Sequence, residues 1–131
     1  MALPIATTTG ICFAFPDTLL TPSPTGQVPM PYPNIAQLAD ADPAASDVNA
    51  GGKAVVHEGS AIPKSTGGEA GTGGGVVQAP QHLGKCTFTT FSKTVKVNGK
   101  GVVRAGDETS QNGGNAIGSV MVGLPTVLVG D

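Results

Sequence analysis

Two stretches of this sequence resemble each other closely and decide the fold: GKAVVHEGS at residues 52–60 and GKGVVRAGD at residues 99–107. Directly before the second copy, TVKVN at 94–98 alternates apolar and polar residues, which is the period of a β-strand. Asn98-Gly99 is a favoured two-residue hairpin turn. The sequence therefore predicts a hairpin whose outgoing strand is 94–98 and whose returning strand is 102–104.

The likeness between the two copies extends along the chain. Each copy is followed by a glycine-rich loop, at 67–70 and 113–116, and then by a short β-branched stretch, at 75–77 and 118–122. A last alternating segment covers 125–130. Repeated units this small cannot bury a face alone, so we expect them to stack around a shared axis. The prediction is an all-β fold, a small cone of short hairpin repeats with pseudo-threefold symmetry; an ordinary β-sandwich is the alternative.

The first third of the chain has a different composition, with eight of the eleven prolines lying before residue 48. Prolines at alternate positions remove N–H donors and favour extended backbone, which predicts a packed, extended or edge segment over residues 15–34. This proline-rich zone is the candidate for a degenerate third copy of the repeat. Residues 34–45 are predicted to form one or two helical turns that end at Pro43.

Composition excludes several classes of protein. The 131 residues are 39% hydrophobic and 12% charged, with a net charge of −2, 20 Gly, 11 Pro and 2 Cys. This excludes a coiled coil and a disulfide-rich scaffold, and it argues against binding to nucleic acid. The first Lys or Arg is Lys53, so the chain lacks the basic start of a secretory signal. We expect a single domain over 1–131 that is made in the cytoplasm and leaves it only through a dedicated machine.

Several motifs resemble those of the PAAR-like proteins of bacterial type VI secretion. FPD at 15–17 with LTP at 20–22, VPMPYPNIA at 28–36 and GSAIPKSTGGEAGTGGGVV at 59–77 look like the opening and middle signatures of that family. The run from Val97 to Ala116 resembles the PAAR repeat itself. The resemblance begins near residue 11 and continues to the end of the chain.

This resemblance implies a structural tip protein. A PAAR-like cone caps the trimeric valine–glycine repeat spike protein (VgrG) of a type VI or related contractile system, and helps it to puncture membranes and deliver effectors. We therefore expect one copy per VgrG trimer, transient contact with the target membrane, and effector or adaptor partners bound without a covalent link, since no toxin domain follows. The expected docking base is an apolar segment: Val28, Pro29, Met30, Pro31, Tyr32 and Pro33.

The family also implies a structural zinc ion, held near the tip by histidines and a cysteine. The candidate ligands are His82 and Cys86, whose spacing suits a metal, together with His57 and Cys12. A free buried cysteine pair or a Cys12–Cys86 disulfide is the alternative, and His57 is expected at a solvent-facing position equivalent to Arg104. Gln111-Asn112 stands where PAAR repeats often have a histidine, which weakens the transfer of zinc ligands to this chain.

Catalytic patterns are poorly supported. The sequence has no G-x-S-x-G motif and no P-loop motif, and Asp107 and Glu108 are interpreted as turn residues. We expect a non-enzymatic protein. The alternative function is a standalone β-rich binding or adaptor module, and an enzyme fragment ranks third.

Overall fold

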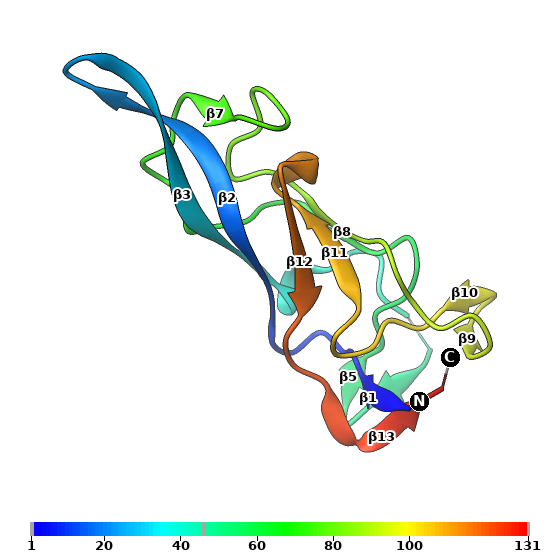
Figure 1. Ribbon diagram of the computed structural model, residues 1–131. Coiled ribbons are helices and arrows are strands. Elements are labelled where there is room, and N and C mark those ends of the chain that lie inside the picture. The colour runs from blue at the N-terminus through cyan, green and yellow to red at the C-terminus, as the bar shows by residue number, and fades with distance from the viewer. Residues whose placement is uncertain (1, 46, 131) are drawn as a thin grey trace.

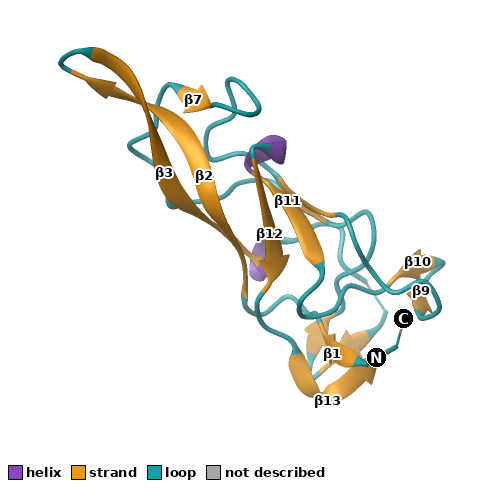
Figure 2. Ribbon diagram, in the orientation of Figure 1, coloured by secondary structure: helices purple, strands orange, loops and turns teal. Residues whose placement is uncertain are grey.

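The computed structural model describes residues 2–45 and 47–130, and its regular structure is β-strand apart from two short 3-10 turns (Figure 2). This confirms the predicted all-β class. No helix within this described part of the chain is long and apolar enough to cross a membrane. The elements are β1 (Leu3–Ile5), β2 (Ile11–Ser23), β3 (Gly26–Gln37), η1 (Leu38–Asp40), β4 (Asn49–Ala50), β5 (Lys53–Ala54), β6 (Ala61–Ile62), β7 (Gly74–Gly75), β8 (Cys86–Phe88), β9 (Lys96–Val97), β10 (Lys100–Gly101), β11 (Glu108–Gln111), η2 (Asn112–Gly114), β12 (Ala116–Val120) and β13 (Leu124–Val129).

The strands form one large antiparallel sheet and three small ribbons. The sheet has the order β3-β2-β12-β11-β8-β6, and β7 also pairs with β2. The ribbons are β1–β13, β4–β5 and β9–β10. Figure 1 shows the ribbons gathered at one end of the molecule together with both chain ends, while the hairpin of β2 and β3 projects at the opposite end.

A ring of three backbone hydrogen bonds joins the three ribbon units. Ala6 N–H donates to the carbonyl of Val103 at 2.9 Å, Val103 to Val56 at 3.0 Å, and Val56 back to Ala6 at 3.1 Å. All three residues are completely buried. Each residue therefore donates to the next and accepts from the previous one, as a threefold axis requires.

A second ring of three backbone hydrogen bonds, made by six other residues of the same units, lies next to the first. Its three bonds run from Thr8 N–H to the Ala54 carbonyl, from Glu58 to Gly101, and from Ala105 to Pro4, at 3.0, 2.7 and 2.8 Å respectively. The two rings together establish the expected pseudo-threefold symmetry within a single chain.

The third copy of the repeat lies at residues 4–8, inside the zone before residue 48 where a degenerate copy is predicted, but ahead of the proline-rich stretch 15–34. Residues 4–8 occupy the place that 54–58 and 101–105 occupy in the other two units. Their ribbon partner is β13, with Leu3 opposite Val129. The strand and its partner stand at opposite ends of the sequence, and no turn joins them, so no hairpin signal marks this copy.

Two tight turns close the other ribbons. Gly51 and Gly52 have φ of 59° and 79°, and Asn98 and Gly99 have φ of 52° and 80°. Positive φ at both central residues is the type I′ pattern, which confirms the predicted Asn98-Gly99 turn. The returning strand is Lys100–Gly101 rather than the predicted 102–104. Val102 N–H still donates to the Val95 carbonyl at 3.1 Å, but Val102 and Arg104 also form isolated bridges with His57 and Ile5, which belong to the other two units.

Two apolar clusters form the core. One lies along the pseudo-threefold axis and contains Ile5, Ala45, Val55, Val97, Val102 and Val129. The other lies under the large sheet and contains Ala6, Cys12, Ala36, Leu38, Val56, Ile62, Cys86, Phe88, Val103 and Val120. Burial of each valine stabilises the fold by about 1.5–3 kcal/mol. Small and β-branched side chains allow three strands to approach one axis.

The proline-rich zone forms the long hairpin of β2 and β3. Its extended backbone agrees with the prediction, but residues 24–31 are exposed rather than packed. The helix predicted over 34–45 is confined to Leu38–Asp40. The residues before it belong to β3, because residues 34–37 pair with residues 11–14 of β2. On its other side Ile35 exchanges two backbone hydrogen bonds with Thr66, of 2.9 and 2.8 Å.

Candidate functional site

The predicted docking segment lies in the projecting hairpin. Val28, Pro29, Met30 and Pro31 are exposed, whereas Tyr32 and Pro33 are half-buried at the base of the hairpin. The Tyr32 hydroxyl shares a hydrogen bond of 2.7 Å with the Thr21 hydroxyl on β2. The six residues thus form one continuous strand, at the end of the molecule opposite to the three ribbons (Figure 1).

A cluster of buried polar side chains lies where this hairpin meets the large sheet. At its centre is the carboxylate of Asp17, which is completely buried. It accepts hydrogen bonds from the side-chain amides of Asn34 at 3.3 Å, Asn112 at 3.1 Å, and Asn115. Asp17 comes from the FPD motif and Asn34 from the PYPN motif, so the signature residues converge here.

Gln111 extends the cluster on the side of β11. Its amide donates to the Asn34 side-chain oxygen at 2.8 Å and to the Asn34 carbonyl at 3.1 Å. Its own oxygen accepts from the Thr109 hydroxyl at 2.7 Å. We call Asp17, Asn34, Gln111, Asn112 and Asn115 the polar staple, because they link β2, β3, β11 and η2.

The polar staple also fixes two loops by their backbone. The Asn112 side-chain oxygen accepts from Gly84 N–H at 2.7 Å. The Asn115 oxygen accepts from Val77 and Gln78 N–H at 2.9 and 2.8 Å. Across the described residues, no buried side-chain nitrogen or oxygen lacks a hydrogen-bond partner. This site was not predicted from the sequence; the one signal was that Asp17 and Asn34 lie inside motifs that resemble those of the family.

The two cysteines lie together in the core. Cys12 on β2 and Cys86 on β8 are both fully buried, free thiols within one apolar cluster. A hydrogen bond with the Cys86 thiol, together with burial, raises the pKa of the Cys12 thiol far above its ordinary value. The disulfide alternative is therefore not the state of this structure.

The two histidines are held elsewhere by backbone carbonyls. His57 Nδ1 lies 2.7 Å from the Glu58 carbonyl, and His82 Nε2 lies 2.9 Å from that of Gly68. Among the described residues, no three His, Cys, Asp or Glu side chains gather as metal ligands would. Zinc needs deprotonated thiols and at least three converging ligands in such a site. The residues predicted to hold zinc do not fit it.

The expectation of a solvent-facing position at His57 is wrong. The backbone rings make Thr7, His57 and Arg104 equivalent, and their exposed fractions are only 6%, 5% and 9%. Arg104 is held by Asp107, whose carboxylate lies 2.8 Å from Nη2 and 3.0 Å from Nε. Asp107 also accepts from the Arg104 N–H at 2.7 Å, which confirms its interpretation as a turn residue.

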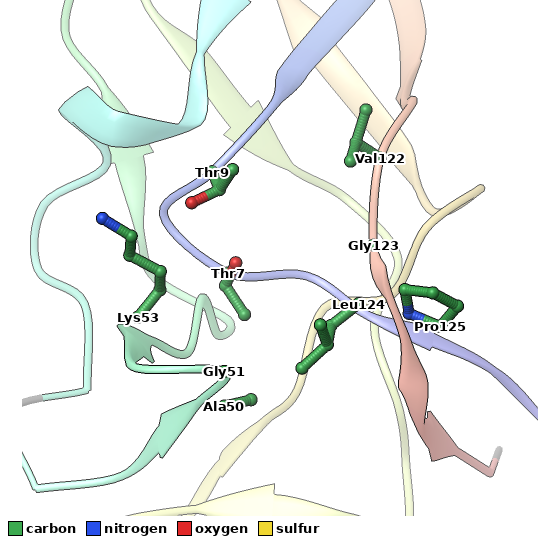
Figure 3. Close-up of a pocket in the computed structure, with 9 residues that line it drawn as sticks. All are labelled: Thr7, Thr9, Ala50, Gly51, Lys53, Val122, Gly123, Leu124 and Pro125. Atoms are coloured by element: carbon green, nitrogen blue, oxygen red, sulfur yellow. The ribbon is translucent and has the colours of Figure 1, made fainter.

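A pocket of about 350 Å³ lies beside Thr7, the smallest of the three equivalent residues Thr7, His57 and Arg104 (Figure 3). Its walls are largely apolar, and Lys53 is its one ionisable lining residue. Figure 3 shows the Lys53 amine on the same side as the Thr9 hydroxyl, with Val122, Leu124 and Pro125 opposite. Thr7 has a smaller side chain than its equivalents His57 and Arg104. The full lining is Thr7, Thr9, Ala50, Gly51, Lys53, Val122, Gly123, Leu124 and Pro125.

The outer face of the large sheet carries exposed apolar side chains. Phe15 is 58% exposed, Ile117 68% and Met121 54%. Ser119 lies opposite Phe13 in the ladder of β12 and β2, which places Phe13, Ile117 and Ser119 on one face of this part of the sheet. This face is suited to contact with another apolar surface.

Comparison with known proteins points to one family. A family model described as the toxin PAAR-like domain matches residues 10–118, which is most of the chain. No curated protein matches the sequence, and no solved structure matches it.

Proposed function

Because the chain belongs to the toxin PAAR-like domain family, we propose that it is a non-enzymatic tip protein of a type VI or related contractile secretion system. In this proposal it caps the trimeric VgrG spike, sharpens it for membrane puncture and assists effector delivery. It assembles in the cytoplasm and is carried out with the spike. The observation that supports the proposal best is the pseudo-threefold symmetry of the two hydrogen-bonded rings.

Symmetry connects this observation to a trimer. Three identical spike chains present three equivalent surfaces, and a single chain matches all of them only if it repeats its own surface around an axis. The backbone of this chain repeats around such an axis at residues 4–8, 54–58 and 101–105, each of which carries one of the three ribbons. The expected stoichiometry is therefore one tip per three spike chains.

The ribbon end is the best candidate for the docking surface, because the three units are displayed there (Figure 1). Lys53 and Lys100 hold equivalent, exposed positions beside the two type I′ turns, and Leu3 is their counterpart in the third ribbon. The segment Val28–Pro33 is the second docking candidate, since its exposed apolar strand also lies at an end of the molecule.

Co-purification with the cognate spike trimer tests the proposal. The complex should have the mass of three spike chains and one tip. A K53W/K100W variant should lose binding at least tenfold if the ribbon end docks, whereas M30W should bind normally. The opposite pattern would assign docking to the hairpin segment. Absence of any complex with the wild-type protein would refute the tip function.

A binding or adaptor module is the second candidate function, and the exposed face of Phe15, Ile117 and Met121 favours it. Such a face suits an effector or an adaptor protein. The I117D variant distinguishes the two roles: it should retain spike binding if the protein is a tip, and should lose its partner if this face carries the function.

A further inference from the structure

We propose that the polar staple replaces a metal in this protein: Asp17 and four carboxamides cross-link the hairpin to the sheet without zinc. The family resemblance implies a zinc ion near the tip, yet the four candidate ligands do not converge on one point. The proposal concerns what holds this region together instead, and it does not depend on the spike-binding function.

The staple occupies the place where the repeat departs from the family. PAAR repeats often carry a histidine where this chain has Gln111-Asn112. Both side chains are completely buried, and both belong to the staple. Two buried carboxamides thus stand where the resemblance implies an imidazole.

The staple also links segments as distant as those that a metal would join. The bond from Asn115 to Asp17 connects residues 98 positions apart, and the one from Gln111 to Asn34 connects residues 77 apart. A carboxylate accepts hydrogen bonds and donates none, so Asp17 can receive three amide N–H groups at once. Contacts of this charge-assisted kind are stronger than those between neutral groups.

Every side-chain oxygen of the polar staple already accepts at least one hydrogen bond. The side-chain oxygen of Asn34 accepts from Gln111, and that of Gln111 accepts from Thr109. The oxygens of Asn112 and Asn115 accept backbone N–H groups of the two loops, at 2.7 to 2.9 Å. Both oxygens of Asp17 are likewise occupied. A metal ion here would compete with these N–H and O–H donors for the same oxygens.

Zinc analysis and thermal melting test the proposal. Protein purified without a histidine tag should contain less than about 0.1 zinc per chain, and neither EDTA nor added zinc chloride should move its melting temperature by more than about 1 °C. The D17N variant replaces an acceptor by a donor that faces three donors, and should melt at least about 5 °C lower. T109V removes one hydrogen bond at nearly constant volume and should show a smaller loss, of about 2–4 °C.

The H82A variant is the matched control, because His82 is a predicted zinc ligand outside the staple. Its melting temperature should be as insensitive to EDTA as that of the wild type. One zinc per wild-type chain, lost with EDTA together with a drop of more than about 5 °C, would overturn the proposal even if D17N fails to fold. Wild-type stability in D17N and T109V would overturn it as well.

Discussion

At the scale of single residues, equivalent positions of the three units carry different side chains that make different contacts. Thr7, His57 and Arg104 share one backbone environment, yet Thr7 borders a pocket, His57 meets a carbonyl and Arg104 forms a buried ion pair. The hydrogen-bonded rings use only backbone groups, so the side chains at these positions are free to differ. Pseudo-symmetry of the backbone thus survives extensive divergence of sequence.

The ion pair of Arg104 and Asp107 is expected to be important for stability. Asp107→Asn removes the charge that balances a buried guanidinium, while the side chain keeps its size. Breaking a buried pair from one side costs about 3–5 kcal/mol. Urea unfolding should show a loss near the lower end of that range. Glu108→Gln, at the neighbouring exposed position, should change stability by less than about 0.5 kcal/mol.

The cysteine pair is expected to be unreactive while the protein is folded. The thiolate is the reactive form, and the raised pKa of Cys12 keeps its thiol protonated. Iodoacetamide at pH 8 should label neither Cys12 nor Cys86 until urea is added. Rapid labelling of the native protein would show that the pair is accessible.

The same shift predicts the direction of a pH effect. The pKa of Cys12 is higher in the folded state than in the unfolded chain, so the folded state retains a proton that the unfolded state releases near pH 9. The contribution is fully present below that pH and is lost as pH rises above it. Unfolding free energy should therefore fall less with alkaline pH in Cys12→Ala than in the wild type.

At the scale of elements, the prolines of β3 determine what its free edge can do. The carbonyls of Thr18 and Leu20 accept hydrogen bonds from residues 76 and 73, so they face away from β3. Their ladder partners are Pro31 and Pro29, which must then face the open side of β3. Pro29 and Pro31 therefore face the open edge, and as prolines they have no N–H with which to pair with another strand.

This placement predicts a specific effect of Pro31→Val. The variant restores an N–H on the open edge, which favours pairing with a second molecule. Light scattering at rising concentration should detect association that the wild type lacks. Met30→Val, whose N–H faces β2, should remain monomeric. Equal association of both variants would exclude the edge as the cause.

The element scale also shows where sequence reasoning succeeds. Asn98-Gly99 has chemistry that only a type I′ turn uses well, so the second ribbon was predictable from local signals. The polar staple was not predictable from the sequence. Asp17, Asn34 and Gln111 are residue types usually found in turns or at the surface, and only tertiary contacts bring them together. Residues 34–37 suggested a helix, but pairing with β2 outweighed that weak local preference.

At the scale of the whole molecule, the pseudo-threefold arrangement depends on a strand pair, β1 and β13, that no local sequence pattern predicts. β1 and β13 lie near opposite ends of the sequence, and they pair to form one of the three equivalent ribbons. Most prolines of the zone before residue 48 lie outside this unit, in β2 and β3. Threefold closure instead needs backbone donors such as Ala6, which prolines cannot supply.

Removal of β13 tests the importance of this closure. Deleting residues 124–131 takes away Val129 from the axial cluster and leaves β1 without its partner. We expect cooperative unfolding to be lost, as judged by near-ultraviolet circular dichroism and one-dimensional NMR. A well-folded truncated protein would mean that the two remaining ribbons suffice.

The pairing of Leu3 with Val129 has one further consequence. The strands of two ribbons are each joined by a type I′ turn, whereas β1 and β13 pair with no turn between them. A circular permutant could join the present ends by an Asn-Gly turn and be opened at Asn98-Gly99 instead. Such a chain would keep every strand pairing, but its termini would lie at the β9–β10 ribbon.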